Sequence, residues 1–336
     1  MATRENSIQQ THAGAVLPRR RTALAALAGW AVGDAGAQQV WPTRAVQIVV
    51  PSSRGAAIGD AAVILAAAFG KRWQQRVQLQ NAPGDGTVSA TLAVARAPAD
   101  GYHLGLSTSA LAINAALRTR LPYSTLADLA PVALLASFQY GIYAHRSLPV
   151  TSAAGLVAYA QAARAPVPYA SPGVGTGAHV ALEAFAFEAG IRVAHKPFVS
   201  AAQAEKAVLA GEPSLLVMAV PSTIPAAMAG PLRLVALMGH KEQTALKGLS
   251  WASDVVSGFE ITGQIGAIAP RAVPKALLQQ IGQELAAAVR LPEVRAALAE
   301  IGMEASGIAS VDAEAYLRAD IARWRLVGRV AGIRLD

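Results

Sequence analysis

The stretch VQIVVPSSRGAAIGDAAVILAAAFGKRW, residues 46–73, decides the fold class of this chain. It opens with the apolar, β-branched run Val46–Val50, continues through a loop of small residues that begins at Pro51, and ends in the alanine-rich periodic segment Ala61–Trp73. These patterns are typical of a strand, a loop and a helix, in that order. The stretch therefore predicts one unit of an α/β fold.

The same alternation continues along the chain. Further strands are predicted at 77–80, 102–107, 140–144, 168–171, 215–218, 232–237 and 261–269. Helices are predicted at 87–96, at 110–117, after Thr151 and at 177–189, and the chain beyond residue 269 is predicted to be helical, with helix starts near Pro274, Pro292 and Asp312. Alternation of this kind gives a parallel-rich α/β sheet.

The first 37 residues are predicted to be an export signal. Arg19-Arg20-Arg21 precedes an apolar run, Thr22–Val32, that is too short to span a bilayer, and Ala35-Gly36-Ala37 has the A-x-A form that signal peptidases cut. The mature chain is expected to start near Gln38, in the periplasm. Twin-arginine export and general secretion both remain open. The alternative, a disordered tail before a cytosolic enzyme, would not need an apolar core with a cleavage triplet.

Composition narrows the class of protein further. Removal of residues 1–37 deletes four basic and two acidic side chains, so the formal charge falls from +8 to +6. The positive residues are dispersed and do not cluster with aromatics, so no nucleic-acid partner is expected. Cysteine is absent, which excludes disulfides, thiolate metal sites and cysteine nucleophiles. Roughly 300 residues remain, which predicts two domains.

Four loops have the composition of an anion site. They are VPSSRGAAIGD (50–60), STSALAIN (107–114), YASPGVGTGAH (169–179) and KPFVSAAQ (196–203). Each places Gly, Ser or Thr just ahead of a predicted helix, where backbone N–H groups and the helix dipole favour a carboxylate or phosphate. Taken singly, each loop also fits an ordinary cap or turn.

The motifs of nucleotide, metal and catalytic sites are missing. Gly173, Gly175 and Gly177 do not follow the dinucleotide spacing, and no Walker loop is present. The histidines lack zinc-ligand spacing, and neither a G-x-S-x-G elbow nor an H-E-x-x-H helix occurs. We therefore expect no catalytic residue, no metal and no cofactor, and we interpret His179 as a capping or packing residue rather than a base.

An ordered set of motifs resembles one receptor family over nearly all of the mature chain. The motifs are Trp41-Pro42, the loop 50–60, Asn81-Ala82-Pro83-Gly84, residues 97–102, Leu121-Pro122-Tyr123, Ala130-Pro131-Val132, the loop 169–179, residues 194–198, Pro221-Ser222, residues 292–295 and Ala331-Gly332-Ile333. In this order they resemble the periplasmic solute receptors of tripartite tricarboxylate transporters, called Bug proteins.

The resemblance implies a two-domain α/β fold of the type II-like periplasmic binding protein (Venus flytrap) kind. Domain one would comprise 38–138 plus 260–336 and domain two 139–259, with crossings near Phe138 and Phe259. A small carboxylate would bind in the cleft between them. One jaw would consist of Ser53, Arg54, Gly55, Ala57, Ile58, Thr108 and Ser109. The other would consist of Ser171, Val174, Gly175 and Thr176.

Two departures from the family pattern bear on the ligand. Asp60 lies nine positions after Pro51 instead of the family's eight, so a one-residue bulge is expected, and Arg54 in this loop either pairs with a second carboxylate or is solvated. Met218 stands where many relatives carry an acidic residue, so an amino group on a ligand would lack its partner. A dicarboxylate or an apolar or aromatic carboxylate is therefore favoured over an amino acid.

The resemblance also implies partners. The receptor is expected to be a monomer that hands its ligand to the membrane subunits of a tripartite tricarboxylate transporter. Two alternatives stay open: a sensor subunit that binds the same ligand and signals to a membrane protein, and a secreted enzyme on a receptor-like scaffold, which the missing catalytic motifs disfavour.

Overall fold

The computed structural model describes residues 41–220, 231–240 and 248–335. The predicted signal peptide, residues 1–37, and the motif Pro221-Ser222 lie outside the described residues. Among the described residues, no helix is both long and apolar enough to cross a bilayer.

Parallel strands joined by helices form the N-terminal part, as predicted. The elements are β1 (Val46–Val50), α1 (Ala57–Trp73), β2 (Val77–Asn81), the 3-10 turn η1 (Asp85–Thr87), α2 (Val88–Ala95), β3 (His103–Thr108), α3 (Ala110–Leu117) and the short α4 (Thr125–Asp128). β1 pairs in parallel with both β2 and β3. Parallel pairing requires a crossover between strands, and α1 and α2 supply it.

The second set of elements repeats this plan and adds antiparallel strands. It comprises β4 (Leu129–His145), α5 (Ala153–Ala162), β5 (Val167–Ser171), α6 (Gly177–Glu188), β6 (Val193–Pro197), α7 (Ala201–Leu209), β7 (Leu215–Ala219), β8 (Leu232–Leu237) and the 3-10 turn η3 (Ala252–Asp254). The chain ends with β9 (Thr262–Pro270), α9 (Lys275–Val289), α10 (Pro292–Glu300), β10 (Glu304–Ala309) and α11 (Ser310–Ala331). β5 pairs in parallel with β6 and β7.

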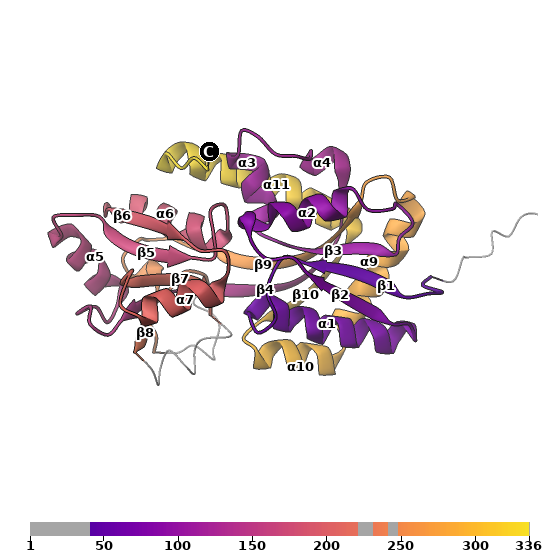
Figure 1. The fold of residues 1–336 in the computed structure, drawn as a ribbon, viewed down its shortest axis with the longest axis horizontal. Helices are drawn as coiled ribbons and strands as arrows, with labels where there is room; N and C mark the ends of the chain where they lie inside the picture. Colours follow the sequence, from indigo (N-terminus) through magenta and orange to yellow (C-terminus); the bar gives the residue numbers. More distant parts are fainter. Residues whose placement is uncertain (1–40, 221–230, 241–247, 336) are drawn as a thin grey trace, which may run out of the picture. The chain divides into compact units, whose positions relative to one another are not determined.

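β4 is the strand that connects the two sets. The strand order is β2-β1-β3-β9-β4-β7-β5-β6, with β8 and β10 also paired to β4 (Figure 1). From Leu129 to Gln139 β4 pairs with β9, and from Tyr140 to Ala144 it pairs with β7. Of its 17 residues almost all are buried, as expected for a strand covered on both faces. The domain boundaries given above stay a prediction.

Three sequence-based predictions about elements were wrong. α1 begins at Ala57 rather than Ala61, so the end of the first candidate loop is helical. β4 begins at Leu129 rather than at Tyr140, and β10 interrupts the predicted all-helical C-terminal region. Both strand errors have one cause. β10 pairs antiparallel with β4 at Ala133–Ser137, and such distant partners override local propensity.

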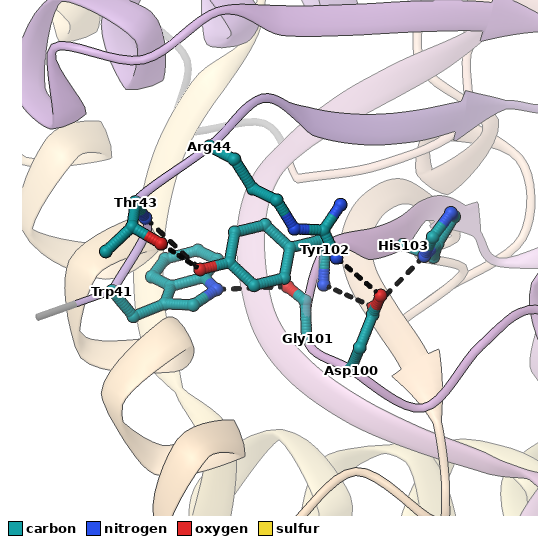
Figure 2. Close-up of polar contacts among 7 residues, drawn as sticks. All are labelled: Trp41, Thr43, Arg44, Asp100, Gly101, Tyr102 and His103. Carbon is teal, nitrogen blue, oxygen red and sulfur yellow. Dashed lines mark hydrogen bonds and ion pairs between the residues drawn. The ribbon is translucent and has the colours of Figure 1, made fainter. Parts of the chain in front are cut away.

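The chain enters the described structure through a buried tryptophan. The indole Nε1 of Trp41 donates to the carbonyl oxygen of Gly101 at 3.2 Å (Figure 2). The ring of Trp41 also meets that of Trp73 in α1 edge-on, with centroids 4.9 Å apart. The ring of Phe69 stacks on that of Trp73, with centroids 5.0 Å apart. Trp41 therefore ties the start of this body to α1 and to the turn before β3.

Polar contacts next to this ring hold the same turn. The guanidinium of Arg44 lies 2.7 Å from the carboxylate of Asp100 and 3.9 Å from the ring centroid of Tyr102 (Figure 2). Asp100 also lies 3.0 Å from Nδ1 of His103. The backbone N–H of Thr43 donates to the Tyr102 hydroxyl at 3.1 Å. One carboxylate thus links the segment before β1 to the segment that begins β3.

This arrangement predicts a graded response at Trp41. Trp41→Ala should lower the free energy of unfolding by about 3–5 kcal/mol, because a buried indole is replaced by a cavity. Trp41→Phe keeps most of the ring contact and loses the hydrogen bond to Gly101, so its effect should be about 1–2 kcal/mol. Urea unfolding of the mature chain measures both values. Equal losses for the two variants would show that ring packing on Trp73 contributes little.

Candidate functional site

A pocket lies where the helix-starting loops of the two sets of elements meet. Its empty volume is about 770 Å³, including its opening to solvent. The lining comes from the loop after β1, the loop after β2, the end of β3, the middle of β4, the loop after β5, the loop after β6 and the end of β7. The residues are Pro51, Ser52, Ser53, Ala56, Ala57, Ile58, Pro83, Gly84, Gly86, Thr87, Thr108, Phe138, Tyr140, Pro172, Thr176, Gly177, Ala178, Val199, Ser200, Ala201, Met218 and Ala219.

The pocket brings together part of the predicted binding set. Five of the predicted residues line it: Ser53, Ala57, Ile58, Thr108 and Thr176. Six do not: Arg54, Gly55, Ser109, Ser171, Val174 and Gly175. Lining the pocket gives the position of a residue and not its contact with a ligand, so ligand contact by each of these residues stays a prediction.

The predicted residues outside the lining differ in their surroundings. Arg54 and Gly55 are exposed at the tip of the first loop. Ser109 is buried, accepts a hydrogen bond from the backbone N–H of Gln264 at 3.2 Å, and lines a separate cavity that also contains Asp320. Ser171 is fully buried beneath the third loop. Ser109 and Ser171 therefore support the loops that form the pocket.

Sequence reasoning missed one wall and the floor. Pro83, Gly84, Gly86 and Thr87, which follow β2, contribute to the lining. The sequence held a usable signal there, because this turn has the same small residues ahead of a helix as the four candidate loops. The floor residues Phe138, Tyr140 and Met218 come from strand interiors, and no local pattern marks such positions as ligand-facing.

The first loop is held by a close backbone approach. A Cβ atom on Gly59 would overlap the carbonyl oxygen of Ser53, so the loop folds back onto the first turn of α1 only because residue 59 is glycine. Asn81 Nδ2, at the end of β2, donates to the carbonyl oxygen of Ser52 at 2.7 Å. These contacts orient the start of α1 toward the pocket.

Three helices begin at the pocket, and their N-termini supply its positive potential. The cap residue of α1 is Ala56, whose side chain cannot cap the helix. Thr176 Oγ1 caps α6 by accepting from His179 N at 3.3 Å, and Ser200 Oγ caps α7 by accepting from Gln203 N at 3.3 Å. The remaining first-turn N–H groups carry the partial positive charge of a helix N-terminus. Among the described lining residues there is no Asp, Glu, His, Lys or Arg, and the one titratable side chain, Tyr140, stays protonated because burial raises its pKa.

Asn114 joins loops from both sets of elements behind the pocket. Its Nδ2 donates to the carbonyl oxygen of Gly86 at 2.8 Å, and its Oδ1 accepts from Arg118 Nε at 2.9 Å. Arg118 also lies 3.4 Å from the carbonyl oxygen of Val174. Gly175 has φ +80°, and a Cβ there would overlap Asn114 Oδ1. The loops after β2 and β5 are therefore fixed against each other by a fully buried amide.

A buried imidazole, His179, and a half-buried one, His195, support the loop after β5. The rings of His179 and His195 stack with centroids 3.9 Å apart. His179 Nδ1 accepts from the N–H of Gly175 at 3.2 Å, and His195 Nε2 shares a 2.7 Å hydrogen bond with Ser171 Oγ. Burial lowers the pKa of His179 to about 3 and the pKa of His195 to about 4. Both rings are therefore neutral at pH 7, and His179 packs and accepts a hydrogen bond, as the sequence analysis interpreted it.

The described residues offer no metal site, since among them no group of three His, Asp or Glu side chains is placed to hold an ion. The chemistry available at the pocket is hydrogen bonding from hydroxyls and helix N-termini over an apolar floor. This arrangement suits the binding of a small anion.

The lowered pKa values of these two imidazoles predict a pH-dependent stability. In the unfolded chain a histidine takes up a proton near pH 6.5, whereas the folded chain resists protonation until the pH nears these lowered pKa values. The free energy of unfolding should therefore decrease progressively as the pH falls below about 6.5. His179 alone should lower it by roughly 3 kcal/mol between pH 7 and pH 4.

Urea unfolding across this pH range measures the effect. His179→Asn keeps an acceptor for Gly175 and cannot titrate, so its stability should depend less on pH than that of the unmodified chain. Superimposable curves for His179→Asn and the unmodified chain would contradict the assignment.

The start of α6 predicts a second effect. A Cβ on Gly177 would overlap the hydroxyl oxygen of Tyr140, so Gly177→Ala should destabilise the chain by about 1–3 kcal/mol through overpacking. Gly155, near the start of α5, is the matched control because its Cβ would meet only Ser152 Oγ at 3.4 Å. Gly155→Ala should stabilise the helix by up to about 1 kcal/mol. Urea unfolding of both variants tests this prediction. A Gly177→Ala variant with unchanged stability would contradict the close approach of Gly177 to the Tyr140 hydroxyl.

Comparison with known proteins supplies the family. The family model "Tripartite tricarboxylate transporter family receptor" matches residues 62–332. The chain is 25% identical over 322 residues to "Protein BugT" of Bordetella pertussis, covering 94% of this chain and 99% of that protein.

Solved structures agree with the fold. The chain is similar to Rpa4515 of Rhodopseudomonas palustris, solved with adipate, at a TM-score of 0.83 and 28% identity, covering 88% of this chain and 99% of that one. It is also similar to MatC of the same organism, solved with malate, at a TM-score of 0.78 and 22% identity, covering 85% and 99%. The predicted two-domain α/β fold of periplasmic binding proteins is confirmed. The chain belongs to the receptor family of the tripartite tricarboxylate transporters.

Proposed function

We propose that this chain is a periplasmic solute receptor that encloses a small organic carboxylate between two α/β domains and delivers it to the membrane subunits of a tripartite tricarboxylate transporter. The ligand is a dicarboxylate or an apolar or aromatic carboxylate. The receptor acts as a monomer after removal of the signal peptide, residues 1–37, by either export route. The domains are 38–138 plus 260–336 and 139–259.

One observation carries this proposal. A pocket without a charged side chain in its described lining receives the N-termini of α1, α6 and α7. Backbone N–H groups aligned by helices stabilise an anion without a counter-ion, and they do so more strongly where water is excluded. The adipate bound to the related Rpa4515 supports a carboxylate as the anion.

Closure of the receptor is coupled to binding by the loops on either side of the pocket. The hydrogen bond from Arg118 to Val174 O and the packing of Gly175 on Asn114 join segments assigned to different domains. A ligand that bridges the same loops favours the closed state by its contacts with both sides. The closed state is the form that a membrane partner can distinguish from the empty receptor.

Calorimetric titration of the mature, ligand-free protein with small carboxylates tests the proposal. At least one carboxylate should bind with micromolar affinity or better. Ala57→Asp places a negative charge at the start of α1, where it suits the helix and opposes an anion, so carboxylate affinity should fall roughly 30-fold or more. Ala57→Asn is the matched uncharged control and should lose far less. If the folded, empty protein binds no carboxylate, the proposal is wrong.

Delivery requires its own measurement. Uptake of the identified ligand by cells should be lost when the gene for this chain is deleted and should return with the unmodified chain. If the ligand binds but its uptake does not depend on this chain, delivery is contradicted and a sensor role is favoured.

A further inference from the structure

The pocket floor is apolar. Phe138, Tyr140 and Met218 form it, and the apolar lining continues through Ile58 and the prolines and alanines of the surrounding loops. Phe138 and Met218 are 3% and 4% exposed, so these side chains have a fixed position in the strands that carry them. The part of a ligand that lies over this floor gains free energy by removing hydrocarbon surface from water.

Several hydroxyl groups in the lining already have partners within the protein. Thr176 Oγ1 donates to the carbonyl oxygen of Gly173 at 2.8 Å as well as capping α6. Ser52 Oγ donates to the carbonyl oxygen of Ser53 at 3.3 Å. The hydroxyl of Tyr140 is hydrogen-bonded to Ser109, and burial raises its pKa, so it stays protonated. These hydroxyl groups are therefore already hydrogen-bonded within the protein, and they carry no net charge that could pair with a charged group of a ligand.

The positively charged side chains near these loops, Arg54 and Arg118, lie outside the described lining of the pocket. Arg54, the sequence-based candidate for pairing with a second carboxylate, is exposed and outside the described lining. Arg118 is also outside it, and its guanidinium is bound to Asn114 and Val174 O. A second carboxylate in the pocket would therefore lose its hydration without gaining a cation from the described lining.

We infer that the ligand of this receptor is a monocarboxylate with an apolar aliphatic or aromatic body. Its single carboxylate lies at the helix N-termini, and its hydrocarbon part lies over Phe138 and Met218. This inference rests on the proposed function and selects one of the two ligand classes that the proposal leaves open. It also separates this chain from the relative that was solved with adipate, a dicarboxylate.

A series of ligands with the same six-carbon chain tests the inference by calorimetric titration. The probes are hexanoate, adipate, 6-aminohexanoate and hexanamide, with benzoate as the aromatic monocarboxylate. Hexanoate or benzoate should bind about tenfold or more tightly than adipate or 6-aminohexanoate. Adipate would bury a second carboxylate and 6-aminohexanoate would bury an ammonium group, and each additional charge costs free energy of desolvation. Hexanamide should bind more weakly than hexanoate because it lacks the anionic group that the helix N-termini stabilise.

A variant at the pocket mouth tests the charge argument without disturbing the core. Val199 lines the pocket and is 59% exposed, so a longer polar side chain there is compatible with folding. Val199→Arg supplies the cation that a second carboxylate lacks and should raise the affinity for adipate relative to hexanoate by about tenfold. Val199→Gln is the matched uncharged control and should leave this ratio unchanged.

The outcomes separate the inference from the proposed function. Tight binding of adipate by the unmodified chain, with hexanoate and benzoate weaker, overturns the monocarboxylate inference and leaves carboxylate reception intact. Equal affinity for hexanoate and hexanamide overturns the role of the helix N-termini. Failure of every carboxylate to bind the folded, empty protein overturns both. An unchanged adipate-to-hexanoate ratio in Val199→Arg contradicts the charge argument.

Discussion

The rest of the structure depends on one buried strand. β4 forms hydrogen bonds with β9 and β10 over its first part and with β7 and β8 over its last part, so the same backbone belongs to both sets of strands. Its partners β9 and β7 are antiparallel to it and pair in turn with β3 and β5, and the loops that follow the parallel strands on both sides contribute to the pocket. Phe138 and Tyr140, at the point where β4 changes partners, form the floor on which a ligand lies. The strand therefore fixes both the fold and the location of the site.

Neutral groups build the rest of the site. The loop after β5 is held by the imidazoles of His179 and His195, whose lowered pKa values keep them uncharged, and by the amide of Asn114. Glycines 59, 175 and 177 permit backbone approaches that any Cβ would block. A site built in this way uses rigid dipoles where other proteins use salt bridges, and it avoids the desolvation of buried charge. Its selectivity depends on how many charges the ligand brings with it.

Local patterns predicted the elements that local chemistry specifies. The strand Val46–Val50 and the helix Ala110–Leu117 were predicted with their observed limits, because a β-branched run before proline and an alanine-rich run after serine encode them within a few residues. β10 was missed, since EASGIA acquires strand structure only by pairing with β4. The site followed the same division. Four loops that contribute to the lining were recognised by their small residues, whereas Met218 was noted only for the acidic residue that it replaces, and Phe138 only for the domain crossing.

By itself, the sequence determined the α/β class and the loops that precede helices. It also determined the absence of cysteine and of nucleotide, zinc and catalytic motifs. Each of these features depends on residue types at short spacings along the chain. Only the tertiary structure decided which side of each loop faces the pocket. Thr176 lines it while Ser171, in the same loop, is hydrogen-bonded to the half-buried imidazole of His195, and Arg54 stays in solvent. The physical reason is that side-chain direction and burial result from packing between segments far apart in the chain, and hydrogen-bond partners such as His195 become available only when those segments meet.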